Sequence, residues 1–291
     1  MRVHRFIFPG FLALALGVAF ATSLTALLLL RPAPTGAQGT STVRYVAITG
    51  TDFGNTCTNP ADPCGTIQHA VDMANPGDEI RIATGVYTHT LQRNGITQSV
   101  YISKSLILRG GYTTTTWAMA PKPNPDMYPV LITPQGLGRG IVITPAVNAT
   151  PGTVPNVGLE ALDVFDGNAM GLGGGAQAED AGGGIYAVTA TLAMTDVSVI
   201  SNTAEIGGGL YARNTVLNVG YSSFLSNTAT AGNGGGLHLA DASGASFLYT
   251  IISSNKTWQS DGGGVYMKNV SEVMWDLVKI FGNRPIPMGA A

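Results

Sequence analysis

The sequence predicts an all-β fold, a parallel β-helix in which short strands form the successive coils of a solenoid. Three observations lead to this prediction. Self-similar segments recur every 25 to 28 residues, which is typical of a solenoid. The periodic stretches are rich in Val, Ile, Thr and Tyr, with apolar side chains at every second position, as in strands. Glycine, at 39 of 291 residues, falls at fixed places in the repeats, where a chain turns sharply.

Composition limits the classes of protein that the chain can belong to. Hydrophobic residues make up 45% of it, so it can bury a core and is not a disordered linker. Residues 1–37 hold three arginines and no acid, and without them the chain has 12 basic and 17 acidic residues, a net charge of −5. No cluster of Lys or Arg remains, so nucleic acid is not an expected partner.

Residues 1–37 are predicted to be an export signal. Basic residues precede an uncharged apolar run at 6–30, and small residues at 35–37 provide a cleavage site. The run is longer than the roughly 7–15 residues of a usual signal core. An uncleaved signal-anchor, the chain's only expected contact with a membrane, is therefore an open alternative. In both cases the rest of the chain is expected outside the cytoplasm, either secreted or at the cell surface or outer membrane.

Residues 38–44 read as a linker, and residues 45–94 as an N-terminal cap that covers the open end of the first coil. The cap holds the only two cysteines, Cys57 and Cys64, which we expect to form a disulfide in an exported protein. The alternative is a redox or metal pair. Six intervening residues do not fit Cys-x-x-Cys chemistry, and no neighbouring histidine indicates zinc, so no metal site is predicted.

A short helix is expected directly after the disulfide loop. Thr66 is a suitable N-cap, and Asn-Pro-Gly-Asp at 75–78 ends the helix. The apolar stripe of this helix consists of Ile67, Ala70, Val71 and Ala74. His69 lies on the polar side, where a lone histidine is ordinarily solvated. A strand with Ile80 and Ile82 on one face follows the helix.

The coils are assigned to residues 95–291, with regular repeats from about residue 160. Strands of the irregular first part are predicted at 99–102, 106–108, 130–132 and 140–143. A polar, proline-rich excursion at 114–129 interrupts them. A degenerate repeat, Val-Phe-Asp-Gly-Asn at 164–168, is separated from four regular copies by a glycine-rich insertion at 170–180.

Two signals define the four regular repeats. The first is a glycine triplet, beginning at Gly182, Gly207, Gly234 and Gly262 and followed by Ile185, Leu210, Leu237 and Val265. The second, about 20 residues later, is an apolar residue followed three positions on by asparagine. The apolar residues of the second signal are Val199, Phe224, Ile252 and Ile280. The two sets of apolar residues are expected to form two internal stacks between the coils.

The asparagines of the second signal are expected to be structural. They are Asn202, Asn227, Asn255 and Asn283. At one corner of the coils their side-chain amides would bond the backbone or each other, forming a ladder. The glycine triplets are expected at corners or at close approaches of strands. They lack the lysine and the strand–loop–helix context of a phosphate-binding loop.

Two parts of the chain resemble known families. The stretch from Cys57 to Tyr87, with Pro-Cys-Gly-Thr-Ile-Gln and Asn-Pro-Gly-Asp, and Leu-Ile-Leu-Arg-Gly-Gly-Tyr at 106–112 resemble the opening of secreted bacterial right-handed parallel β-helix proteins of the pectin-lyase-like superfamily. The repeats are similar to those of polymorphic outer-membrane proteins. Phe-Leu-Ser-Asn at 224–227 has their Phe-x-x-Asn form, although the other copies carry Val or Ile and the triplets have Gly for the usual Ala. The resemblance implies a right-handed β-helix but little about activity, because this fold carries lyases, hydrolases and adhesins alike.

Catalytic residues are not identified by the sequence. Lyase chemistry of the pectate type needs an acidic calcium cluster with an arginine base. Hydrolysis of the polygalacturonase type needs close carboxylates with Gly-His-Gly and Arg-Ile-Lys patterns. Neither pattern is present. No cofactor is therefore expected, and calcium held by acids beside the glycine triplets stays an alternative.

The candidate ligand-binding residues follow the inward aliphatic residues of the first signal. They are Tyr186, Tyr211, His238 and Tyr266. Because neighbours along a strand face opposite ways, these side chains would form an exposed aromatic strip suited to stacking on sugar rings. Strand propensity and stacking between coils explain the same residues without a ligand.

The expected function is that of a non-enzymatic, exported adhesion or glycan-binding module. Its expected partner is a polysaccharide or a cell-surface glycan. The alternative is a polysaccharide lyase or glycoside hydrolase with its site in the loops near 114–129 or 170–180. The two functions predict different arrangements of acidic residues. A lyase brings several acids and an arginine together on one face of neighbouring coils.

Overall fold

A computed structural model describes residues 41–93, 95–115, 117, 129–175, 179–242, 244–258 and 260–286. The predicted export segment, residues 38–40 of the linker and most of the excursion at 114–129 lie outside the described residues. Residues from Thr40 onward form one compact unit, so the cap and the coils are not separate domains. Among the described residues, no helix is long and apolar enough to cross a membrane.

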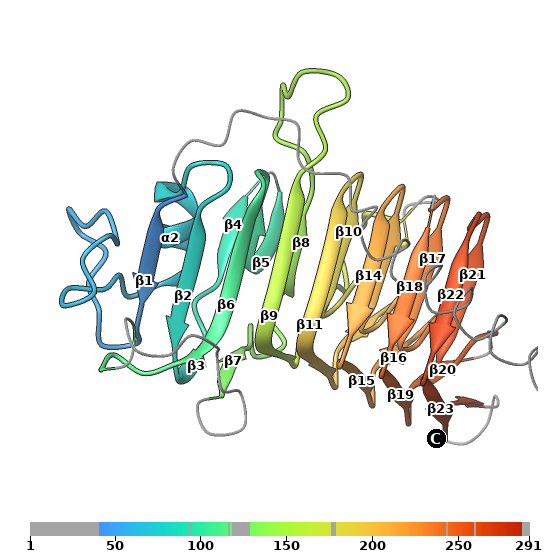
Figure 1. The fold of residues 1–291 in the computed structure, drawn as a ribbon. Coiled ribbons are helices and arrows are strands. Elements are labelled where there is room, and N and C mark those ends of the chain that lie inside the picture. Colours follow the sequence, from blue (N-terminus) through green and yellow to red (C-terminus); the bar gives the residue numbers. More distant parts are fainter. Residues whose placement is uncertain are drawn as a thin grey trace, which may run out of the picture. The chain divides into compact units, whose positions relative to one another are not determined.

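The described residues form an all-β fold with three sheets, whose strands pair in parallel apart from one hairpin. Figure 1 shows strands of successive repeats lying side by side. The main row of the thirteen-stranded sheet is β1 (Val43–Val46), β2 (Glu79–Ala83), β6 (Leu106–Tyr112), β9 (Asn156–Phe165), β11 (Thr191–Ile200), β14 (Val216–Gly220), β18 (Ala245–Leu248) and β22 (Val273–Asp276). Its remaining strands are β3 (Gly85–Tyr87), β7 (Val130–Ile132), β15 (Ser223–Leu225), β19 (Ile251–Ser253) and β23 (Lys279–Phe281).

The other two sheets complete each repeat. The seven-stranded sheet holds β4 (Leu91–Arg93), β5 (Ile96–Ile102), β8 (Arg139–Ile143), β10 (Ile185–Val188), β13 (Leu210–Arg213), β17 (Leu237–Ala240) and β21 (Val265–Lys268). The four-stranded sheet holds β12 (Thr203–Ala204), β16 (Thr228–Ala229), β20 (Lys256–Trp258) and β24 (Arg284–Ile286). The predicted strands at 99–102, 106–108, 130–132 and 140–143 all lie within strands of the structure.

Repeats pair in register, each with the next. Ile185 pairs with Leu210, Leu210 with Leu237, and Leu237 with Val265. Because side chains alternate across a strand, this register places every aliphatic residue of the first signal on the same face of its sheet. Ile185, Leu210 and Leu237 are fully buried in the main core, and Val265 is partly buried against it. The first predicted stack is therefore present.

The second predicted stack is present in three of its four members. Val199, Phe224 and Ile252 pair in register and are fully buried. The prediction is wrong for Ile280, which is 53% exposed. Ile280 lies on β23, which pairs only with β19 among the described strands, so no further strand covers its side chain.

The predicted asparagine ladder is confirmed. The Nδ2 atoms of Asn202, Asn227 and Asn255 each donate to Oδ1 of the next ladder asparagine, at 2.9, 3.0 and 2.9 Å. The same Oδ1 atoms accept the backbone N–H of the preceding asparagine. Each Nδ2 also donates to a backbone carbonyl of an earlier repeat, as from Asn227 to Val199. These bonds satisfy side chains that are fully buried at positions 202, 227 and 255.

In the degenerate repeat, a glycine occupies the position of the ladder asparagine. Val164 pairs with Val199, so the position that corresponds to Asn202 is Gly167 and not Asn168. The backbone N–H of Gly167 donates to Oδ1 of Asn202 at 2.7 Å. Asn168 instead accepts the backbone N–H of Met170. The ladder of side chains therefore begins at Asn202.

The predicted helix and disulfide of the cap are both present. Helix α2 (Ile67–Met73) has Thr66 as its N-cap, whose hydroxyl accepts the backbone N–H of His69 at 3.2 Å. The predicted apolar stripe is buried. Cys57 and Cys64 form the disulfide. His69 is not simply solvated as expected, because its Nε2 lies 2.8 Å from the carbonyl oxygen of Asn55 in the disulfide loop.

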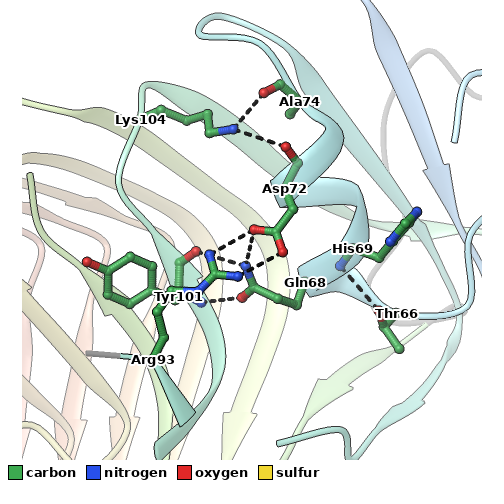
Figure 2. A network of polar contacts seen from close by, with 8 residues as sticks. All are labelled: Thr66, Gln68, His69, Asp72, Ala74, Arg93, Tyr101 and Lys104. Carbon is green, nitrogen blue, oxygen red and sulfur yellow. Dashed lines mark hydrogen bonds and ion pairs between the residues drawn. The ribbon is translucent and has the colours of Figure 1, made fainter. Parts of the chain in front are cut away.

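A buried glutamine joins the helix to strand β5 of the seven-stranded sheet, as shown in Figure 2. Oε1 of Gln68 accepts the backbone N–H of Tyr101 at 2.6 Å, and its Nε2 donates to the carbonyl oxygen of Tyr101 at 3.3 Å and to Asp72 at 2.8 Å. Arg93 donates to both carboxylate oxygens of Asp72. Burial alone would raise the pKa of Asp72, but these bonds outweigh it and lower that pKa. β4 pairs only with Ile96–Gln98 of β5, so the side chain of Gln68 takes the place of a neighbouring strand at Tyr101.

Candidate functional site

The four predicted ligand-binding side chains form a continuous column on the seven-stranded sheet. Tyr186, Tyr211, His238 and Tyr266 pair in register on β10, β13, β17 and β21. Their ring centroids follow one another at 5.7, 5.2 and 4.8 Å. Tyr186 and Tyr211 belong to a cluster separate from the main core. The predicted direction of the column, away from the core, is therefore confirmed.

The prediction that this column is exposed is wrong, because three of its members are buried and the fourth is exposed only in part. Tyr186 and His238 are 9% exposed and Tyr211 only 1% exposed, whereas Tyr266 is partly buried. The cause lies in segments outside the strands. Ala181 and Ile206 pack in the same cluster as Tyr186 and Tyr211. The hydroxyl of Tyr186 donates to the carbonyl oxygen of Gly174, in the glycine-rich insertion.

A buried arginine holds this insertion over the start of the column. Nε of Arg139 donates to the carbonyl oxygen of Ala181 at 2.7 Å, and Nη2 donates to that of Gly173. The guanidinium lies 4.8 Å from the ring centroid of Tyr186, at cation–π distance. Burial lowers the pKa of Arg139 to about 10, against the opposing influence of Tyr186 and Asp180. The group therefore remains cationic at neutral pH.

Beyond the insertion, the other end of the column opens into a groove of about 350 Å³. Tyr211, His238 and Tyr266 line it. The charged side chains that also line it are Glu179, Glu205, Asp241 and Lys268, joined by the amides of Asn233 and Asn269. We call this the column groove. The acids do not recur at one phase of the repeats, so only the folded chain brings them together.

Two polar side-chain atoms in the column groove have no hydrogen-bond partner among the described residues. The hydroxyl of Tyr211 makes no hydrogen bond there, although the side chain is almost fully buried. His238 uses Nδ1 on the carbonyl oxygen of Asn233 at 3.3 Å, and its Nε2 has no partner within the described chain. Neither atom is among the fully buried unpartnered atoms of the described chain, and both side chains line the groove, so these atoms are positioned to bind a ligand or water.

Two carboxylates of the column groove, those of Glu205 and Asp241, are each oriented by one hydrogen bond. One oxygen of Glu205 accepts the backbone N–H of Asp180 at 2.8 Å. Oδ1 of Asp241 accepts Nδ2 of Asn269 at 2.9 Å. The carboxylate of Asp180 accepts the backbone N–H groups of Gly171 and Gly173 within the insertion. Its role is therefore to shape the insertion.

Burial gives His238 a pH-dependent influence on stability. Burial lowers its pKa below 6.5, although the carbonyl of Asn233 and the charge of Glu179 oppose the shift. As pH falls below 6.5, the unfolded chain therefore takes up a proton that the folded chain does not. The free energy of unfolding decreases through this window until the folded-state pKa is reached.

The substitution His238→Tyr tests this pH dependence, because tyrosine occupies the same place in three other repeats. We expect the variant to lose less unfolding free energy than the wild type on acidification. Urea denaturation at a series of pH values on both sides of 6.5 measures the difference. An identical pH dependence of the two proteins would show that His238 is not the group responsible.

Metal-ligating side chains converge at one place within the described chain. The ligand atoms of Cys57, Cys64 and His69 lie within 4.8 Å of one another. The expectation that no histidine neighbours the cysteines is therefore wrong in space. Both sulfur atoms form the disulfide and are not thiolate ligands. The disulfide and His69 instead anchor the loop. Among the described residues, the acids of the column groove do not form such a trio.

The exposed aromatic residues of the repeats lie elsewhere than predicted. Tyr221 and Tyr249 are 57% and 49% exposed, and their rings stack with centroids 5.1 Å apart. Both have positive φ, at the bends that follow β14 and β18. Each lies three residues before the apolar residue of the second signal. The aligned residues of the other two repeats are Asp196 and Leu277, so alignment marks the position but not its exposure.

Comparison with protein-family models, with curated proteins and with solved structures finds no match to this chain. Function must therefore be inferred from the site itself.

Proposed function

We propose that the chain is an exported, right-handed parallel β-helix protein of the pectin-lyase-like kind, and that it binds a glycan in the column groove. The observation that carries this proposal is the groove itself. It combines the rings of Tyr211, His238 and Tyr266 with unpartnered polar atoms, carboxylates and amides. Sugars present apolar ring faces and hydroxyl groups together, so they match such a surface.

The architecture and the disulfide support the proposed compartment and fold. Parallel strands that pair in register from repeat to repeat are what stacked coils require. The disulfide between Cys57 and Cys64 is typical of proteins in oxidising environments. Together with the apolar segment at 6–30, it favours secretion or display at the cell surface or outer membrane.

Glycan binding is tested by substitution within the column groove. We expect Tyr266→Ala to weaken binding of a recognised oligosaccharide about tenfold, which is the scale of one lost ring contact. Tyr211→Phe keeps the buried ring and removes only the hydroxyl, so it should weaken binding without loss of stability. Screening on an oligosaccharide array followed by calorimetry measures both effects.

The matched control is Tyr249→Ala, which removes an exposed aromatic ring outside the column groove. It should leave glycan affinity unchanged. Loss of binding in Tyr249→Ala with retention in Tyr266→Ala would refute the column groove as the site. Absence of binding to every oligosaccharide on the array would refute the glycan-binding function.

A second candidate function, a polysaccharide lyase or glycoside hydrolase, is favoured by one specific observation. The column groove brings together Glu179, Glu205 and Asp241 from separate segments. Arg213 lies close enough to Tyr211 to oppose the rise that burial causes in the pKa of that tyrosine. Release of unsaturated or reducing ends from the bound glycan, abolished by Glu205→Gln, would favour the enzyme. Binding with no product formed favours the module.

A further inference from the structure

We propose that the column groove selects a cationic amino-sugar glycan and rejects polyuronates. This specificity rests on the proposed glycan-binding function and names its substrate class. It differs from the acidic polysaccharides that the pectin-lyase-like resemblance would suggest. The argument rests on which charges line the groove and which of their atoms are free to meet a ligand.

Negative charge exceeds positive charge in the column groove. Three carboxylates, those of Glu179, Glu205 and Asp241, line the groove with one ammonium, that of Lys268. The guanidinium of Arg213, which acts on Tyr211, is a second cation nearby, so the acids still outnumber the cations. Lys268 forms no ion pair with these acids among the described residues. His238 adds no positive charge at neutral pH, because burial lowers its pKa. A ligand that enters therefore meets an acidic surface.

Two of the carboxylates have an oxygen available for a ligand. Glu205 uses one oxygen on the backbone of Asp180, and Asp241 uses Oδ1 on Asn269. The second oxygen of each has no hydrogen-bond partner among the described residues. A carboxylate held by one bond is already oriented, and a charge-assisted bond from an ammonium group completes it. A uronate carboxylate brought to the same place would be repelled.

The aromatic column supplies the part of the site that is independent of charge. Tyr211 is 1% exposed and its hydroxyl has no partner within the described chain. Tyr266, at the more open end, provides a ring contact and Tyr211 a hydroxyl contact to a sugar of any charge. Sugar-ring contacts and charge selection therefore come from different residues, so substitution separates them.

The test compares three oligosaccharides of equal length, built from glucosamine, N-acetylglucosamine and galacturonic acid. Calorimetry is performed near pH 6.5, where the amines carry positive charge and His238 is mostly neutral because burial lowers its pKa below this value, with and without added calcium. We expect the glucosamine oligomer to bind about tenfold more tightly than its N-acetylated counterpart. The galacturonic acid oligomer should not bind in either condition.

The charge variant is the double substitution Glu205→Gln and Asp241→Asn. Both replacements keep the oxygen that accepts the observed hydrogen bond, so the groove should stay folded. The preference for glucosamine should disappear while the N-acetylated oligomer binds as before. Glu272→Gln removes one negative charge at an exposed acid outside the groove. This control should leave the affinities of the three oligosaccharides unchanged.

The outcomes distinguish this specificity from the function on which it rests. Equal or tighter binding of the N-acetylated oligomer overturns the amino-sugar proposal and leaves glycan binding intact. Binding of the galacturonic acid oligomer, with or without calcium, has the same consequence. Failure of all three oligomers to bind overturns the amino-sugar proposal, and failure across the whole oligosaccharide array overturns glycan binding as well.

Discussion

Gly208→Ala is expected to lower the free energy of unfolding by about 3 kcal/mol or more. A Cβ atom at this middle glycine of the triplet would lie 2.3 Å from the carbonyl oxygen of Thr228 and 2.8 Å from that of Gly235. Both obstacles are backbone atoms of the neighbouring repeat, so no side-chain rotation relieves the overlap. Urea denaturation measures the loss as a reduced midpoint.

Gly220→Ala is the matched control, because Gly220 belongs to the same repeat and a Cβ there meets no atom within 4 Å. We expect this variant to change stability by less than about 1 kcal/mol, in the stabilising direction, since alanine restricts the unfolded chain. If Gly208→Ala were as stable as Gly220→Ala, close approach between repeats would not be the reason for the triplet.

Asn227→Ala is expected to cost about 3–4 kcal/mol, because it breaks the asparagine ladder at its centre. Its Oδ1 accepts both the backbone N–H and the Nδ2 of Asn202, at 3.0 and 2.9 Å. Its Nδ2 donates to Val199 and Asn255, at 2.8 and 3.0 Å. Alanine leaves these buried groups without partners, and unpaired buried polar groups are costly.

The control for the ladder is Asn218→Ala, again within the same repeat. Asn218 is exposed and accepts a hydrogen bond from the hydroxyl of Ser246 at 2.8 Å. We expect its removal to change the free energy of unfolding by less than about 0.5 kcal/mol, as for other surface substitutions. Equal losses in Asn218→Ala and Asn227→Ala would contradict a stabilising role specific to the ladder.

The repeat architecture was predictable because each of its signals is local and recurs. Glycine triplets, inward aliphatic residues and ladder asparagines return at a spacing of 25 to 28 residues. Stacked coils require such equal spacing, so alignment of the copies predicts the partners across strands. The degenerate copy shows the limit of this reasoning. There Gly167 takes the ladder position, since pairing of Val164 with Val199 sets the register.

Contacts between the cap and the coils were not predictable in the same way. Gln68 and His69 occur once each and follow no period, so their sequence carries no sign of a partner. The fold places Gln68 against the backbone of Tyr101 and His69 against that of Asn55. These partners lie 33 and 14 residues away in the chain, and only the packing of α2 brings them within reach.

The candidate site was likewise predictable only in part. The column of Tyr186, Tyr211, His238 and Tyr266 follows from strand alternation, and the structure keeps its register. Its burial does not follow, because a single insertion held by Arg139 covers one end of the column. The exposed pair at Tyr221 and Tyr249 was missed, since exposure at a bend depends on how far the neighbouring segments extend.

The sequence by itself determined which residues pair between the regular repeats and, with the exception of Ile280, which of them face the core. These properties depend on short-range geometry, namely the alternation of side chains and the equal length of the repeats. Only the tertiary structure decided which outward side chains meet solvent and which acids share a groove. Glu179, Glu205 and Asp241 come from segments without a common phase. Their assembly depends on how the loops between strands fold over the sheet.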